Sequence, residues 1–176
     1  MESSIVTLKH FKMEKTINTV DSPLIEYVDG KYLVRWNGQQ DPKAKGVISF
    51  DEISFPYKPS LDTIKEVILG VENSRIDKEI LSGFVWNGMS VWLSSENQFN
   101  YKAAYDLASQ TNGGSLPVTF KFGDTENPVY HEFKTLDDIA DFYVKAMSHV
   151  NNTLKEGWES KDSIDWGLYE KALENL

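Results

Sequence analysis

Alternating apolar and polar residues in the first third of the chain predict short β-strands. The four runs are Ile5–Leu8, Leu24–Val28, Tyr32–Trp36 and Gly46–Phe50. Asp29-Gly30 separates the second run from the third, and both residues tolerate the positive φ of a tight hairpin turn. The other residues before Leu24 are mostly polar, with isolated Phe11, Met13 and Ile17. We therefore predict that residues 1–59 form an N-terminal arm followed by a small antiparallel β region.

Residues 60–82 have the spacing of a connecting helix. Ser60 is a favourable N-cap, and Gly83 marks the end. Apolar residues recur at intervals of three and four, at Ile64, Val67, Ile68 and Val71. Gly70 weakens a helix by about 1 kcal/mol relative to alanine, so we expect a kink or break near Asn73.

Two further hairpins are predicted in the second half of the chain. Asn87-Gly88 between Phe84–Trp86 and Ser90–Leu93 is the strongest short hairpin signal in the sequence. The second hairpin has Leu116–Phe122 and Val129–Phe133 as strands, joined by a turn at Asp124–Pro128.

Helical periodicity follows each of these hairpins. Ser95 and Gln98 have capping-box spacing, and the helix they open ends at Asn112-Gly113-Gly114. This helix carries Phe99, Ala103 and Leu107 on one stripe, with Tyr101 and Tyr105 beside it. Thr135 is the predicted cap of the longest helix, which we expect to end at Gly157. The apolar stripe of that helix is Ile139, Phe142, Tyr143, Ala146, Val150 and Leu154.

The order hairpin, helix, hairpin, helix favours an α+β fold. We predict one compact ββαββα unit over residues 83–166, with both hairpins in one antiparallel sheet and the helices packed on it. Residues 167–176 are then a C-terminal helical tail.

Charge and composition exclude several classes of partner. The formal net charge is −9, and lysine and arginine form no cluster, which argues against nucleic acid. The longest apolar runs are only a few residues, so we expect no membrane span. The first residues lack the basic start and apolar stretch of a signal peptide, which predicts folding in a cytoplasm. The absence of cysteine excludes disulfides, thiolate metal sites and cysteine nucleophiles.

Catalytic and metal-binding patterns are weak. His10, His131 and His149 show no metal-ligand spacing, so we expect no metal and no cofactor. A Ser-His-Asp site is recognised by geometry and stays open, although no nucleophile-elbow motif supports it. The paired carboxylates, Asp51-Glu52, Asp137-Asp138 and Asp162 with Asp165, suit helix caps and solvated faces. A glycoside-hydrolysing pair is the alternative interpretation.

Aromatic residues are concentrated between positions 86 and 105. Trp86, Trp92, Phe99, Tyr101 and Tyr105 can pack together as a core, or leave some rings at the surface as a protein-binding patch. Neighbouring strand residues point to opposite faces, so one hairpin cannot bury all its apolar residues on one side. The candidate interface residues are therefore Trp86 and Trp92, together with Ile5, Leu8 and Phe11 of the arm.

A family resemblance rests on two stretches of sequence. Residues 82–102 read Ser-Gly-Phe-Val-Trp-Asn-Gly-Met-Ser-Val-Trp-Leu-Ser-Ser-Glu-Asn-Gln-Phe-Asn-Tyr-Lys, and residues 116–122 read Leu-Pro-Val-Thr-Phe-Lys-Phe. With the following helix to Asp165-Trp166, they resemble the phage and prophage family called domain of unknown function 4376, of the type found in phages of Bacteroidales. The resemblance covers residues 82–166, about half of the chain, and carries no catalytic residue.

This resemblance implies a non-enzymatic structural protein of a bacteriophage virion, in the tail fibre or baseplate region. Its expected partners are other tail proteins and further copies of itself in a symmetric assembly. A tail-fibre assembly chaperone that leaves the finished virion is the first alternative, and an enzyme acting on cell-surface glycans is the second. We further expect the arm, residues 1–21, to pack against another chain, so that its deletion leaves the monomer folded.

Overall fold

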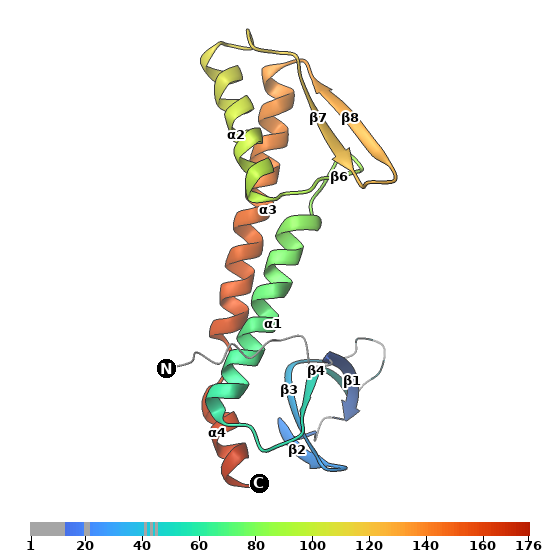
Figure 1. Ribbon diagram of the computed structural model, residues 1–176, viewed down its shortest axis with the longest axis vertical. Coiled ribbons are helices and arrows are strands. Elements are labelled where there is room, and N and C mark those ends of the chain that lie inside the picture. Colours follow the sequence, from blue (N-terminus) through green and yellow to red (C-terminus); the bar gives the residue numbers. More distant parts are fainter. Residues whose placement is uncertain (1–12, 20–21, 41, 43, 45) are drawn as a thin grey trace. The chain divides into compact units, whose positions relative to one another are not determined.

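The computed structural model of the chain describes residues 13–19, 22–40, 42, 44 and 46–176 (Figure 1). Helices and antiparallel strand pairs make up these residues, which confirms the predicted α+β class. The chain divides into two compact units. We call Met1–Val71 with Ser163–Leu176 the sheet unit, and Glu72–Asp162 the aromatic unit.

The sheet unit contains one antiparallel sheet of four strands. They are β1 (Met13–Thr19), β2 (Ile25–Val28), β3 (Lys31–Gln40) and β4 (Val47–Phe55), in the spatial order β1-β4-β3-β2. The predicted hairpin joins β2 to β3. Asp29 and Gly30 have φ of 50° and 78°, as a two-residue turn of this kind requires.

Strand β1 corrects the prediction for part of the arm. Residues Met13–Thr19 pair with β4 of the same chain, from Met13 opposite Ile53 to Thr19 opposite Val47. These residues therefore complete a sheet rather than reach for another chain. The predicted strand Ile5–Leu8 lies outside the described residues.

The core of the sheet unit includes the C-terminal helix. Helix α1 (Leu61–Ser82) begins at the predicted cap, where Ser60 Oγ accepts from Thr63 N at 3.1 Å. Helix α4 (Trp166–Glu174) places Tyr169 in the core, and its hydroxyl donates to the Arg35 carbonyl at 2.8 Å. The C-terminal residues are therefore part of this unit rather than a separate tail. The buried set is Ile25, Val34, Trp36, Ile53, Phe55, Ile64, Val67, Ile68 and Tyr169.

The aromatic unit has the predicted order of elements, but not the single sheet. It contains β5 (Val85–Trp86), β6 (Met89–Ser90), α2 (Ser95–Gln110), β7 (Val118–Gly123), β8 (Pro128–Phe133) and α3 (Leu136–Asp162). The hairpins β5–β6 and β7–β8 form two separate two-stranded sheets, so the prediction of one sheet is wrong. Backbone bonds explain why: Val91 N donates to Phe84 O and Leu93 N to Leu81 O, so the segment after β6 bonds away from β7.

The connecting helix predicted at residues 60–82 corresponds to α1, but it has no break near Asn73. The predicted end of α3 is wrong, because α3 continues past Gly157 to Asp162. Side-chain contacts join these helix ends within the aromatic unit, because a Cβ at Gly157 would meet Ile76 Cδ1 and Lys161 Nζ lies 2.8 Å from Asn73 Oδ1. Gly157 therefore allows close helix packing instead of ending a helix.

Candidate protein-binding surface

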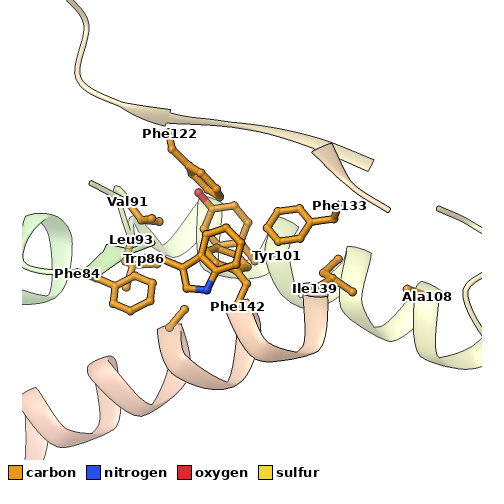
Figure 2. Packing of buried hydrophobic residues seen from close by; sticks show 11 residues of the cluster. Phe84, Trp86, Val91, Leu93, Tyr101, Ala108, Phe122, Phe133, Ile139 and Phe142 are labelled. Atoms are coloured by element: carbon orange, nitrogen blue, oxygen red, sulfur yellow. The ribbon is translucent and has the colours of Figure 1, made fainter. Parts of the chain in front are cut away.

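Trp86 is the centre of a cluster of aromatic rings in the aromatic unit (Figure 2). Its side chain is 2% exposed, and its ring centroid lies 5.3 Å from those of Phe133 and Phe142. The indole Nε1 donates to Asp141 Oδ2 at 3.1 Å. Trp86, a candidate interface residue in the sequence, is therefore a core residue.

The carboxylate that receives this bond has a second donor. Lys145 Nζ donates to Asp141 Oδ2 at 2.8 Å. The Lys145 hydrogen bond, and then the Trp86 hydrogen bond, lower the pKa of Asp141 below its ordinary value. The charged Asp141 carboxylate thus joins Lys145 of α3 to the aromatic cluster.

The described histidines have structural contacts. His131 lies against the Trp86 ring at 4.8 Å, and its Nε2 is 3.4 Å from Asp138 Oδ2. His149 Nε2 is 3.0 Å from the Glu79 carbonyl. Neither of these contacts involves a serine hydroxyl, and His10 lies outside the described residues. Across the described part of the chain, no three His, Asp or Glu side chains gather as metal ligands.

The carboxylates considered for hydrolysis also have structural partners. Glu52 Oε2 accepts from Arg35 Nε at 2.7 Å, and Asp51 Oδ2 accepts from Asn37 Nδ2 at 3.0 Å. Asp165 caps α4 by accepting from Gly167 N at 3.0 Å. These contacts support the interpretation of the carboxylates as parts of the fold.

Helix α2 buries the face that carries Tyr101, not the stripe of Phe99, Ala103 and Leu107. Its cap is Ser94, one residue before the predicted cap, and Ser94 Oγ accepts from Asn97 N. Tyr101 and Ala108 are buried, with Ala104 and Tyr105 packed beside them. Tyr101 contacts the Phe120 and Phe142 rings at 4.8 and 5.0 Å, and burial raises its pKa to about 12.

The predicted stripe lies on the solvent side of α2 instead. Phe99 is 71% exposed and Leu107 is 53% exposed, with exposed Ala103 midway between them. We call these three residues the α2 stripe. Sequence spacing suggested the stripe correctly, but not the side of the helix that faces the core.

A groove with a volume of about 620 Å³ lies beside Trp92, and we call it the Trp92 groove. The Trp92 side chain is 53% exposed, next to buried Val91. Lys121 lines the groove from β7, on the face opposite the core residues Phe120 and Phe122. The lining residues are Ser82, Ser90, Val91, Trp92, Lys121, Gly123, Asp124 and Thr125.

The main chain at Trp92 leaves one polar group for a ligand. The Trp92 carbonyl accepts from Asn97 Nδ2 at 2.8 Å. Val91 N and Leu93 N both bond towards the preceding segment, and successive N–H groups of an extended chain point to opposite edges. Trp92 N–H therefore points the other way, and it has no partner among the residues that the structure describes.

The end of the groove is a stable turn. Asp124 Oδ1 accepts from Asn127 N at 2.7 Å and from Glu126 N at 2.8 Å. These hydrogen bonds lower the pKa of Asp124 below its ordinary value. The backbone bond from Asn127 contributes most, followed by the Asn127 side-chain bond and the Glu126 backbone bond. Gly123 has φ of 78°, and a Cβ there would meet the Asn127 carbonyl, so this position requires glycine.

Of the five interface candidates, the structure places one at the surface. Trp92 lines the groove, Trp86 is buried, and Ile5, Leu8 and Phe11 lie outside the described residues. Sequence reasoning did not find Lys121 as a groove residue. Its alternation with Phe120 and Phe122 was the signal that could have placed it on the outer face of the hairpin.

No helix in the described ranges is long and apolar enough to cross a membrane. Comparison of the chain with family models, with curated proteins and with solved structures finds no match. The resemblance to the phage family therefore stays a prediction.

Proposed function

We propose that this chain is a structural protein that acts by protein–protein contact, in an oligomeric part of a bacteriophage tail. The exposed α2 stripe carries the contact part of this proposal. The virion part rests on the sequence resemblance of residues 82–166. The proposal includes no catalytic step.

The α2 stripe is costly to expose and has no role in the core. Helix α2 already buries Tyr101 and Ala108 on its other side. Full burial of a Phe or Leu side chain stabilises a complex by about 1.5–3 kcal/mol. Aromatic and aliphatic residues grouped on one face are typical of the centre of a protein interface.

The stripe also suits a second copy of itself. Phe99 and Leu107 are each four residues from Ala103. In an antiparallel pair of α2 helices with a two-fold axis at Ala103, Phe99 of each copy meets Leu107 of the other. Small Ala103 lets the helices approach. Four such side chains gain about 6–12 kcal/mol, against at least about 4 kcal/mol for association, so the net gain of roughly 2–8 kcal/mol favours the pair.

The test is the molar mass of the full chain by light scattering over a range of concentrations. We expect a dimer or larger species, and we expect Phe99→Glu with Leu107→Glu to lower its molar mass. Val144→Glu is the matched control, because Val144 is a 57% exposed apolar residue on α3 of the same unit. A wild-type monomer at about 1 mM, or a double variant with the same molar mass as the wild type, would refute the α2 contact.

The place of the protein in the particle needs a separate measurement. Mass spectrometry of purified virions should detect the protein in the tail fraction. Its presence in infected cells but not in virions would support the assembly chaperone instead.

A further inference from the structure

We propose that the Trp92 groove binds residues 1–12 of a second copy of this chain, as an extended peptide. We call residues 1–12 the N-terminal segment. This inference rests on the proposed function, because it names how one copy engages the next. It uses a surface separate from the α2 stripe.

The groove offers main-chain hydrogen bonding to an extended ligand. Trp92 N–H points away from the bonds made by its two neighbours and has no partner in the described part of the chain. On the far wall, β7 pairs with β8 on one side, and no other described strand is hydrogen-bonded to it. Peptides that bind along such edges gain affinity from the main chain and specificity from alternate side chains.

The side chains of the groove fit an apolar peptide with an acidic group. The half-exposed Trp92 ring offers a large apolar surface beside the hydroxyls of Ser90 and Thr125. Lys121 makes no ion pair with any described residue, so its ammonium group is available to a carboxylate. The volume of about 620 Å³ lies within the range of about 300–1,000 Å³ that ligand pockets have.

The N-terminal segment has the matching sequence. Ile5–Leu8 is a run of four residues that favour strands, and in extended form it spans about 13 Å. Such a short run needs a partner to offset about 1–2 kcal/mol of ordering per residue. Glu2 lies three residues before Ile5 and supplies a carboxylate that can pair with Lys121.

Charge and reach both allow a second copy to donate this peptide. The segment has Lys9 and Lys12 against Glu2, whereas the whole chain carries −9, so any copy of the chain attracts the segment. It precedes Met13, the first residue of β1, and twelve extended residues reach about 40 Å. A segment-in-groove contact is head-to-tail, and it builds a ring or a filament rather than a two-fold dimer.

The direct test is fluorescence anisotropy with a labelled synthetic peptide of residues 1–12. The receptor is the full chain with Ile5→Asp, because its own N-terminal segment then competes less with the labelled peptide for the groove. We expect saturable binding that Trp92→Ala weakens at least tenfold and Lys121→Ala weakens less. Trp158→Ala is the matched control, because Trp158 is also about half exposed, at 55%, in the same unit. A scrambled peptide should not bind.

Light scattering of the full chain then separates this contact from the α2 contact. We expect Ile5→Asp and Trp92→Ala to reduce the assembly equally while leaving circular dichroism unchanged. No peptide binding up to about 1 mM, or binding that Trp92→Ala does not weaken, overturns the proposal. Peptide binding without any effect of either variant on molar mass also overturns it, because the segment then serves its own chain. Peptide binding should survive Phe99→Glu with Leu107→Glu, so either contact can fail alone.

Discussion

Among the described residues, the four strands of the sheet unit form one hydrogen-bonded sheet, whereas the two hairpins of the aromatic unit form separate sheets. The sheet unit buries a charged pair, Arg35 with Glu52, inside its structure. The aromatic unit instead centres on rings around Trp86 and leaves Phe99 and Trp92 at its surface.

The comparison shows where cohesion comes from in each unit. A continuous sheet holds its strands together through backbone hydrogen bonds, so the order of the strands depends less on individual side chains. Two short hairpins without a shared ladder depend on side-chain packing to stay together. The unit held by side-chain packing is also the one that exposes the α2 stripe and the Trp92 groove.

The largest expected effect is the difference in stability between variants of the two tryptophans at the β5–β6 hairpin, Trp86 and Trp92. Trp86→Ala should destabilise the protein by about 3–5 kcal/mol, because it removes the central ring and leaves a cavity. Trp92→Ala should change stability by at most about 0.5 kcal/mol, as is usual for an exposed residue. Chemical denaturation followed by circular dichroism measures both. Equal losses for the two variants would contradict the contrast between core and groove.

A smaller loss is expected from the buried ion pair of the sheet unit. Glu52→Gln should cost about 2 kcal/mol, since Arg35 loses its closest carboxylate but keeps Glu26 Oε2 at 2.8 Å and the Pro23 carbonyl at 3.0 Å. Lys155→Ala, which removes an exposed i,i+4 pair, is the control and should cost under about 0.5 kcal/mol. Amide hydrogen exchange should locate the loss of protection in β3 and β4. Faster exchange in α3 would contradict this assignment.

Deletion of residues 1–21 tests the corrected view of the arm. The deletion removes β1 and its seven register pairs with β4, and we expect a loss of about 2 kcal/mol, or about 4–8 °C in Tm. Deletion of residues 1–12 alone leaves β1 and should change Tm little. Thermal scans at one low protein concentration compare the two. If both deletions leave Tm unchanged, β1 does not stabilise the sheet.

Local signals in the sequence gave much of the fold. The two-residue turns at Asp29-Gly30 and Asn87-Gly88 were predictable, because positive φ at both positions demands such residues. The caps at Ser60 and Thr135 were also predictable, because a cap hydroxyl accepts from a backbone N–H only three residues later. Thr135 Oγ1, for example, accepts from Asp138 N. These signals depend only on neighbours in sequence.

Long-range packing was harder to predict. Gly157 packs against Ile76, which lies 81 positions away in the sequence and on another helix. Without knowledge of that contact, the glycine predicted the end of a helix that in fact continues. On α2, Phe99 and Leu107 are more apolar than Ala104 and Ala108, yet the small residues face the core. On that face the large contacts come from Tyr101, whose ring meets those of Phe142 and Phe120. The Trp92 groove could not be predicted, because it depends on how two unpaired hairpins approach.

Gly157 gives a test of that long-range contact. Gly157→Ala gains about 1 kcal/mol of helix propensity but places a methyl group against Ile76, which costs about 1–3 kcal/mol. We expect a net loss of about 1 kcal/mol by urea denaturation. Combining it with Ile76→Ala should remove the clash, so the double variant loses less than the sum of the two single variants. Additive losses would show that the two helices do not meet at this pair.

The smallest expected effect is the pH dependence of the contact between Asp141 and Trp86. The pKa of Asp141 is lowered from its ordinary value of 3.8, so the folded state favours the charged carboxylate. Its contribution is fully present above that value and is lost as the pH falls through the lower folded-state pKa. Because Asp141 is close to solvent, the change in stability should be small, and the indole N–H resonance of Trp86 is the sharper measurement. We expect that resonance to shift as Asp141 is protonated below about pH 4. Asp141→Asn should abolish the shift, whereas Asp137→Asn, one turn away on α3, should leave it intact. A resonance that titrates equally in both variants would mean that another group controls the indole.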